Sequence, residues 1–325
     1  MTSCGKSEST GVNDSNKRFL EAWLKVNHPD AVKDGLGIYI LGETPGSGKS
    51  AGKPEDYPYA YLDYTSTDLE GNVLESTDAS LAKQLGSYAD GNYYGPVIRL
   101  RNSTAMTAGQ EMVLNPMHVG GRRKAVIPGW FNTTNFRYKT EEDYLKNVTG
   151  EDIILDVTLL DVISDITAWQ LDSIYNYMVH NFKTPADSLK YGFYYYQLVP
   201  PTDTTSFESN DIVYINYTGR LLSGKVFDTT DEKTAKDAGI FSTSSKYEQL
   251  KVTRSSDYKD YTFTVGSSSA GFVDGFSYCL SRMKTGEKGV CIFYSELGYK
   301  GTGKGNIPAF SPLRFEIEMI GKNKK

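Results

Sequence analysis

The side chains that most often carry out covalent or metal chemistry are few in this chain and lie far apart in the sequence. Its cysteines and histidines are Cys4, Cys279, Cys291, His28, His118 and His180. Three cysteines cannot form a disulfide framework, and the histidine spacing fits no zinc-binding motif. Each could supply a single reactive group, although packing or surface roles are the simpler interpretation. We therefore expect no metal and no other cofactor.

A glycine-rich segment at residues 42–50 partly matches a phosphate-binding loop. Its sequence is Gly-Glu-Thr-Pro-Gly-Ser-Gly-Lys-Ser, which places five residues between Gly42 and the Gly-Lys-Ser group, whereas the motif requires four. The Pro- and Tyr-rich residues that follow do not predict a helix, and the motif depends on the N–H groups of a helix N-terminus. A β-turn is the better prediction for this segment.

The first residues resemble the end of a bacterial lipoprotein signal. Two small residues precede Cys4, and a polar stretch follows to about Asn16. In such proteins the apolar signal segment is removed and the cysteine is acylated. The resemblance implies a lipid anchor on Cys4 and a location in the bacterial cell envelope, in the periplasm or at the outer membrane. The alternative is a soluble protein in which Cys4 has no such role.

Length and composition narrow the class of protein. A chain of 325 residues predicts two domains. Its net charge of −5, from 35 basic and 40 acidic residues, argues against an electrostatic nucleic-acid or lipid-surface binder. No apolar stretch approaches the roughly 18 residues of a membrane span. Aromatic residues make up 13% of the chain, with 24 tyrosines, which suits an extended β-surface.

An internal repeat determines the expected architecture. Residues 69–78, Leu-Glu-Gly-Asn-Val-Leu-Glu-Ser-Thr-Asp, align with residues 222–231, Leu-Ser-Gly-Lys-Val-Phe-Asp-Thr-Thr-Asp, at an offset of 153. Further pairs follow, the last of them after a short insertion: Tyr64 with Tyr217, Gly86 with Gly239, and residues 117–120 with 283–286. The repeat predicts two bodies with the same fold.

A predicted helix and then a strand lead into each body. The helices are residues 15–26, with Phe19, Ala22, Trp23 and Val26 on one face, and residues 165–182, with Leu171, Ile174, Met178 and Phe182 at helical spacing. Ser164 or Asp165 could cap the second helix. This helix could space the two bodies rigidly or pack on one of them. The strands are residues 37–41 and 192–198.

Short alternating strands and a short helix make up each body. Residues 211–217 and 313–319 alternate apolar with polar side chains, and residues 272–283 form an amphipathic helix pattern. The fold class is therefore α+β, with a twisted antiparallel sheet wrapped on a short helix in each domain. The expected organisation is a flexible tether (1–14), an N-terminal domain (15–163), a linker helix (164–190) and a C-terminal domain (191–325).

The second body resembles the FKBP-type peptidyl-prolyl cis–trans isomerases. Residues 215–219, Ile-Asn-Tyr-Thr-Gly, and 223–230, Ser-Gly-Lys-Val-Phe-Asp-Thr-Thr, are similar to the family's Tyr-Thr-Gly and Gly-x-x-Phe-Asp-Ser-Ser. Residues 272–276, Phe-Val-Asp-Gly-Phe, are similar to its Val-Ile-x-Gly-Trp helix, and residues 280–287 to the Met-x-x-Gly-Glu turn. Three shorter motifs complete the order: Gly-Tyr-Lys-Gly at 298–301, Ile-Pro at 307–308 and Leu-Arg-Phe at 313–315.

The resemblance implies an isomerase that needs neither nucleophile nor metal. Rotation about an X–Pro amide crosses a barrier of roughly 18–20 kcal/mol, and a dry aromatic cleft favours the less polar, twisted amide. By resemblance Tyr299 would donate its hydroxyl to a substrate carbonyl, the backbone N–H of Ile307 would bind another carbonyl, and Asp228 would orient the amide at the cleft wall. The implied lining residues are Tyr217, Phe227, Tyr261, Phe272, Val273, Phe276 and Phe315.

Some positions depart from the family pattern. Phe276 stands where many members have Trp, residues 307–309 read Ile-Pro-Ala instead of Ile-Pro-Pro, and residues 231–260 form a long insertion. We expect proline-containing exported polypeptides as clients, and macrolide inhibitors of the FKBP class as less certain ligands. We expect no nucleic acid, and membrane contact only through Cys4. The alternative function is a non-catalytic polypeptide-binding, chaperone or scaffold module.

The first body resembles the family more faintly. The repeat places Leu74 and Glu75 at the Phe-Asp position, and Met106, Thr107 and Gln110 opposite Phe272, Val273 and Phe276. A glutamine at the cleft floor needs hydrogen-bond partners and water. The hypothesis is that this domain keeps the fold without catalysis, and that it binds extended polypeptide, dimerises or acts as a spacer.

Overall fold

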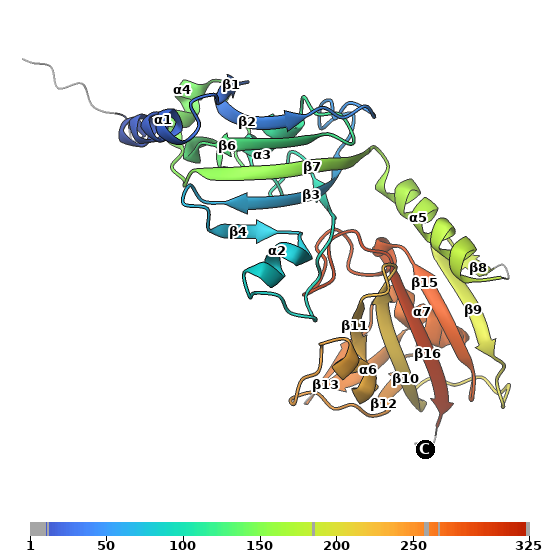
Figure 1. Cartoon of the computed structure of the whole chain (residues 1–325). Coiled ribbons are helices and arrows are strands. Elements are labelled where there is room, and N and C mark those ends of the chain that lie inside the picture. Colours follow the sequence, from blue (N-terminus) through green and yellow to red (C-terminus); the bar gives the residue numbers. More distant parts are fainter. Residues whose placement is uncertain (1–10, 12, 184–185, 257–259, 266, 323–325) are drawn as a thin grey trace, which may run out of the picture. The chain divides into compact units, whose positions relative to one another are not determined.

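The structure is a computed structural model that describes residues 11, 13–183, 186–256, 260–265 and 267–322. The chain forms two compact units, one of residues 1–87 and 94–164 and the other of residues 88–93 and 165–325. Each unit contains one antiparallel sheet and a few helices, so the predicted α+β class is confirmed (Figure 1). Among the described residues, no helix has both the length and the hydropathy that crossing a bilayer requires.

The first unit has a seven-stranded sheet in the order β1-β2-β6-β7-β3-β4, with β5 also paired to β3. Its strands are β1 (Val32–Asp34), β2 (Ile38–Thr44), β3 (Tyr59–Thr67), β4 (Val73–Ser76), β5 (Val97–Leu100), β6 (Arg122–Ile127) and β7 (Ile153–Ile163). Its helices are α1 (Asp14–Asn27), α2 (Ala79–Gln84), α3 (Ala108–Leu114) and α4 (Glu141–Asn147), with the 3-10 turn η1 (Gly129–Phe131).

The second unit has a nine-stranded sheet in the order β14-β13-β12-β10-β16-β15-β9-β8, with β11 also paired to β10. Its strands are β8 (Asp187–Lys190), β9 (Phe193–Val199), β10 (Ile212–Leu221), β11 (Val226–Thr229), β12 (Leu250–Arg254), β13 (Tyr261–Val265), β14 (Ser268–Gly271), β15 (Lys288–Phe293) and β16 (Leu313–Gly321). Its helices are α5 (Ile166–Asn181), α6 (Glu232–Asp237) and α7 (Asp274–Arg282), with the 3-10 turn η2 (Ser295–Leu297).

Hydrogen bonds and glycine conformations repeat between the two units. The backbone N–H of Tyr64 donates to the Thr77 hydroxyl, and that of Tyr217 to the Thr230 hydroxyl, both at 2.9 Å. The paired glycines share left-handed backbone angles: φ is 89° at Gly71 and Gly224, and 68° at Gly86 and Gly239. This conformation favours glycine. The repeat inferred from the sequence is therefore a structural repeat as well.

The predicted helix at residues 15–26 is confirmed as α1, but its predicted buried face is wrong. Leu20 and Leu24 are buried, whereas Phe19 is 58% exposed and Val26 80% exposed. Apolar residues recur at helical spacing on more than one side of α1, so the periodicity alone could not decide which side meets the core. Trp23, from the predicted face, does pack against the core of this unit.

Helix α5 packs on the sheet of the second unit and is more than a connection. Asp165 caps it, because its carboxylate accepts hydrogen bonds from the N–H groups of Thr167 and Ala168 at 2.9 and 3.0 Å. Ile174 and Met178 join a buried cluster with residues of β9 and β15. Of the two predicted roles for this helix, packing on a domain is the one observed.

Part of the predicted insertion at 231–260 is regular structure that both units share. Asp231 caps α6 by accepting from the Thr234 N–H, as Asp78 caps α2 by accepting from the Ser80 N–H. Strand β12 then pairs with β10 as β5 pairs with β3. The hairpin of β13 and β14 follows β12 and lengthens this edge of the sheet.

The glycine-rich segment at 42–50 contains no helix. β2 ends at Thr44, and the residues that follow pack against the chain at 118–121. A Cβ atom added at Gly46 would lie 2.3 Å from the His118 carbonyl oxygen, so the close approach requires glycine there.

Candidate active site

Aromatic rings from three elements of the second unit meet at one end of α7. The Phe276 ring centroid lies 5.3 Å from that of Tyr217 on β10 and 4.7 Å from that of Phe315 on β16. Both pairs are close to perpendicular, at 74°, which is a favoured geometry for aromatic rings. Gly275 lets the helix approach the sheet, because a Cβ there would lie 2.5 Å from the Phe293 ring.

Two more rings extend this cluster towards the surface. Phe227 lies edge-on to Phe315 at 5.4 Å, and Phe272 lies 4.4 Å from Phe276. Phe276 and Phe315 are only 1% and 4% exposed, whereas Tyr217, Phe227 and Phe272 are half-buried. The five rings therefore form one aromatic cluster, in which two rings are buried and three are partly exposed.

One of the half-buried rings, Tyr217, forms a hydrogen bond with Asp228. The Tyr217 hydroxyl donates to the Asp228 carboxylate at 2.7 Å. Burial, and then the negative charge of Asp228, raise the pKa of Tyr217 well above its ordinary value. The phenol therefore stays protonated at neutral pH and remains the donor in this hydrogen bond.

Tyr299 adds a second hydroxyl to this region. It follows η2, is half-buried, and packs against the same core cluster as Tyr217 and Phe227. Burial, followed by the charge of Asp228, raises the pKa of Tyr299. The hydroxyl is therefore protonated at neutral pH, as hydrogen-bond donation to a substrate carbonyl requires.

Two residues implied by the family resemblance do not have the predicted roles. The backbone N–H of Ile307 already donates to the Lys304 carbonyl at 3.0 Å, so a substrate carbonyl would have to displace this bond. Tyr261 is 0% exposed and offers no surface to a ligand. Its hydroxyl is buried next to Arg254, and burial raises its pKa to about 12. Tyr261 is therefore a core residue of this unit.

Val273 is half-buried and immediately precedes α7, whose N-cap it forms. Within the part of the chain that the structure describes, no acceptor receives its backbone N–H. The backbone N–H of Val273 is thus available as a hydrogen-bond donor, which an analysis of side-chain types did not predict. Only its position before the helix could have indicated it, because the first N–H groups of a helix have no partner within the helix.

Residues from 240 to 251 extend the site beyond the aromatic rings. A cavity of about 940 Å³ is lined by Tyr217, Phe227 and Asp228 together with this segment, including Tyr247. The Tyr247 ring stacks on Phe241 at 5.3 Å, which orders the segment. The cavity therefore adjoins the aromatic cluster and shares Tyr217 and Phe227 with it.

Two of the three cysteines lie in the core of the second unit. Cys279 and Cys291 are buried free thiols, and burial raises the pKa of Cys279. The predicted lipidation site, Cys4, lies outside the described residues. In that described part of the chain, no three His, Cys, Asp or Glu side chains are grouped to hold a metal ion.

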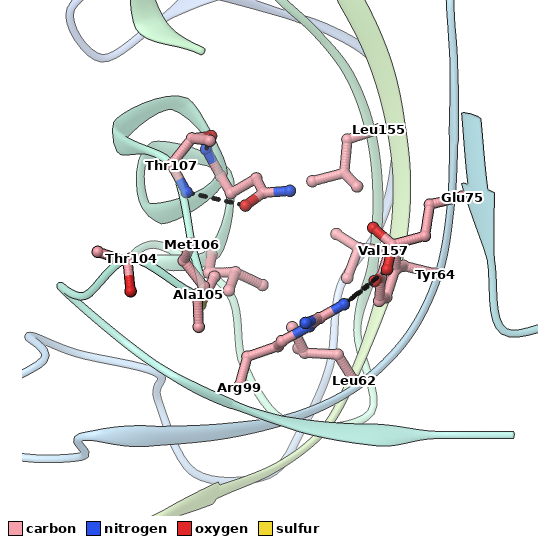
Figure 2. A pocket seen from close by; sticks show the side chains of 12 residues that line it. Leu62, Tyr64, Glu75, Arg99, Thr104, Ala105, Met106, Thr107, Leu155 and Val157 are labelled. Carbon is pink, nitrogen blue, oxygen red and sulfur yellow. Dashed lines mark hydrogen bonds and ion pairs between the residues drawn. The ribbon is translucent and has the colours of Figure 1, made fainter. Parts of the chain in front are cut away.

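The first unit has a different site at the equivalent position (Figure 2). Arg99 on β5 donates to the Tyr64 hydroxyl and, at 2.7 Å, to the Glu75 carboxylate. The side-chain oxygen of Gln110 accepts the Thr107 N–H at 2.9 Å in a capping box, which satisfies this oxygen. Arg99 was missed in the sequence, since only the strand register shows that its side chain reaches Tyr64.

Comparisons with known proteins agree with this geometry. A family model described as FKBP-type peptidyl-prolyl cis-trans isomerase matches residues 203–320. FK506-binding protein 2 of Dictyostelium discoideum is 30% identical over 140 residues, which are 43% of this chain and 84% of that protein. The chain therefore belongs to the FKBP-type peptidyl-prolyl cis–trans isomerase family, as the sequence motifs predicted.

Three solved structures share part of their sequence with this chain. A peptidyl-prolyl cis-trans isomerase from Pseudomonas syringae is 26% identical, covering 48% of this chain and 96% of that chain, with a TM-score of 0.31. The three FKBP domains of wheat FKBP73 are 14% identical, covering 89% of this chain and 95% of that chain, with a TM-score of 0.31. FkpA from Escherichia coli is 18% identical, covering 46% of this chain and 58% of that chain, with a TM-score of 0.31.

Proposed function

We propose that the second unit catalyses cis–trans isomerisation of X–Pro bonds in exported polypeptides, within the cleft around Phe276. The observation that carries this proposal is the arrangement of three half-buried rings over two buried ones beside the Tyr217–Asp228 hydrogen bond. This surface can bury a proline ring and remove water from the adjoining amide. The planar amide has more charge separation than the twisted amide, so a drier environment lowers the barrier to rotation.

Hydrogen-bond donors at the cleft would hold the polypeptide on either side of the proline. In this proposal Tyr299 donates its hydroxyl to one carbonyl and the Val273 N–H donates to another. Asp228 accepts from Tyr217 and so fixes the phenol against the base of the cleft. No step requires a covalent intermediate, because only a bond rotation occurs.

An exchange experiment tests the proposal on the full-length protein. The cis and trans signals of a short Ala-Pro peptide are followed by two-dimensional exchange NMR, with wild type, Phe227→Ala and Phe19→Ala. Phe227 is a cleft wall, whereas Phe19 is an exposed phenylalanine on α1. We expect exchange catalysed by wild type and Phe19→Ala, and a loss of about tenfold or more with Phe227→Ala, because an apolar wall is removed.

The alternative is a polypeptide-binding module without turnover. Phe276 in place of the family's tryptophan, and the cavity that residues 240–251 form with the cleft, favour binding over a longer segment. Peptide binding without accelerated exchange, from a protein with an intact fold, would support this alternative and contradict the catalytic proposal.

We also infer an envelope location with a lipid on Cys4. The small residues before Cys4 and the polar stretch after it support this inference. Mass spectrometry of the protein from its native source would show an acyl and glyceryl addition at Cys4. An unmodified cysteine in that material would contradict the lipid anchor and favour a soluble folding factor.

A further inference from the structure

The first unit contains a cavity of about 250 Å³ between β3, β7 and the segment that leads into α3. Its apolar lining is buried and mainly aliphatic: Leu62, Met106, Leu114, Leu155 and Val157. Pockets for drug-sized ligands are usually about 300–1,000 Å³. This cavity therefore suits a smaller group, such as one aliphatic side chain with its neighbouring peptide group.

Polar groups converge on one side of this cavity. Figure 2 shows Arg99, Tyr64 and Glu75 across from the segment that carries Ala105 and Met106. The Arg99 Nη2 donates to both Tyr64 and Glu75. Among the described residues, no acceptor receives the hydrogens on its Nε and Nη1. The guanidinium therefore keeps donors for a ligand.

Arg99 stands where the second unit has a buried core valine, Val252. Arg99 on β5 pairs with Ala60 on β3. In the second unit the equivalent pair is Val252 on β12 with Val213 on β10. Position 252 is fully buried and apolar, whereas Arg99 is partly exposed at 31% of its side chain. The first unit thus has a partly exposed arginine at the rim of its cavity, where the second unit has a buried apolar side chain.

The cavity of the first unit keeps one aromatic wall, Tyr64, and lacks counterparts of the rings of Phe227, Phe272 and Phe276. Leu74, at the position of Phe227, is 56% exposed and does not line the cavity. Met106 and Gln110 replace the rings of Phe272 and Phe276. A cation that donates to an amide oxygen also stabilises the planar, charge-separated amide. Such a donor opposes the rotation that an isomerase must promote.

We propose that this cavity binds an aliphatic side chain of an extended polypeptide, with Arg99 donating to the adjacent peptide carbonyl, and that it does not require or isomerise proline. The choice of a polypeptide rests on the proposed function, because the cavity repeats the position of the isomerase cleft. Glu75 neutralises Arg99 at 2.7 Å, so a neutral carbonyl suits the site better than an anion. The first unit then holds unfolded segments while the second acts on their prolines.

Methyl NMR on the full-length protein tests this directly. Met106 lies in the cavity, whereas Met283 and Met319 lie in the core of the second unit. With ¹³C-labelled methionine methyl groups, assigned through Met106→Leu, the protein is titrated with acetyl-Ala-Ala-Leu-Ala-Ala-amide and with the same peptide carrying Gly for Leu. We expect a saturable shift of the Met106 signal with the leucine peptide, at a dissociation constant of about 1 mM, and no shift with the glycine peptide.

Three variants locate the binding site. Arg99→Gln should weaken the leucine peptide about tenfold, since one charge-assisted hydrogen bond is lost, and Ala105→Trp at the exposed rim should block it. Arg122→Gln is the matched control, because this exposed arginine pairs with Asp156 outside the cavity. Equal shifts with the glycine peptide, no Met106 shift at 10 mM peptide, or unchanged binding by Ala105→Trp would each overturn the inference.

Isomerase activity on the same samples separates this inference from the proposed function. We expect Arg99→Gln and Ala105→Trp to retain the wild-type exchange rate of an Ala-Pro peptide. A missing Met106 shift in a protein with full isomerase activity contradicts the cavity proposal alone. A normal Met106 shift in a protein without isomerase activity contradicts the proposed catalysis alone.

Discussion

The hydroxyl of Tyr217 donates to the carboxylate of Asp228 at 2.7 Å, and the Tyr217 ring contacts those of Phe276 and Phe315. In the first unit the equivalent residues are Tyr64 and Glu75, and Arg99 donates to both of them. One fold therefore presents two kinds of site. Arg99, on the neighbouring strand β5, is one residue that distinguishes them, because the equivalent position in the second unit holds Val252.

The Tyr217–Asp228 hydrogen bond should matter more for activity than for stability. We expect Asp228→Asn to lower kcat/KM about tenfold, since a charge-assisted hydrogen bond contributes about 1.5–3 kcal/mol. Asp228 is exposed, so the free energy of unfolding should change by less than about 1 kcal/mol. Isomerase assays and urea unfolding measure the two effects. Asp237→Asn, on exposed α6, is the control, and an equal loss of activity in both variants would contradict the assignment.

Phe272 and Phe276 should respond differently to truncation, although their rings lie 4.4 Å apart. Phe276→Ala should destabilise the protein by about 3–5 kcal/mol, because it opens a cavity in the core. Phe272→Ala should cost less stability, since this ring is half-buried, while still lowering kcat/KM. Urea unfolding and the isomerase assay test the pair. Full activity of Phe272→Ala would contradict the prediction that Phe272 contacts the substrate.

Arg101 should be a stability residue of the first unit. Its side chain is 0% exposed, pairs with buried Glu111 at 3.1 Å and donates to the Ala51 carbonyl at 2.8 Å. Arg101→Met would leave Glu111 buried without its cation, at a cost of about 3–5 kcal/mol. Arg122→Met, which removes an exposed pair with Asp156, should cost at most about 1 kcal/mol. Similar midpoints for the two variants in urea would show that Arg101 is dispensable.

Buried tyrosines predict that the protein loses stability in alkali. Burial raises the pKa of Tyr64, Tyr195 and Tyr217 above the ordinary value of 10. The folded state then holds these protons more tightly than the unfolded state, so the free energy of unfolding is constant below about pH 9 and falls as the pH rises above 10. Urea unfolding at pH 8 and 10.5, with absorbance at 295 nm, measures this. Greater stability at pH 10.5 would contradict the sign.

Much of the fold was predictable from the sequence because local and long-range signals agree. Gly71 and Gly224 occupy the same left-handed turn, and Tyr64 and Tyr217 the same strand position, so the repeat identified two copies of one fold. The family motifs then predicted that Tyr217, Phe227, Phe276 and Phe315 would meet.

The sequence predictions failed where the type of a residue does not determine its surroundings in the folded chain. Phe19 and Val26 fit an apolar helix face, yet Leu20 and Leu24 on another side are buried. The Ile307 N–H forms a turn hydrogen bond that sequence similarity does not reveal. Arg99 required the register between β3 and β5, which depends on the folded sheet.

A protease-coupled isomerase assay tests the central claim most directly. Full-length wild type is compared with a Tyr299→Phe, Asp228→Ala double variant on a short X–Pro peptide, with circular dichroism and urea unfolding as controls for the fold. The account predicts isomerisation faster than the uncatalysed rate for wild type, and a loss of about tenfold or more for the folded double variant. Wild type at the uncatalysed rate, or a double variant as active as wild type, would contradict the assignment of this cleft as a prolyl isomerase.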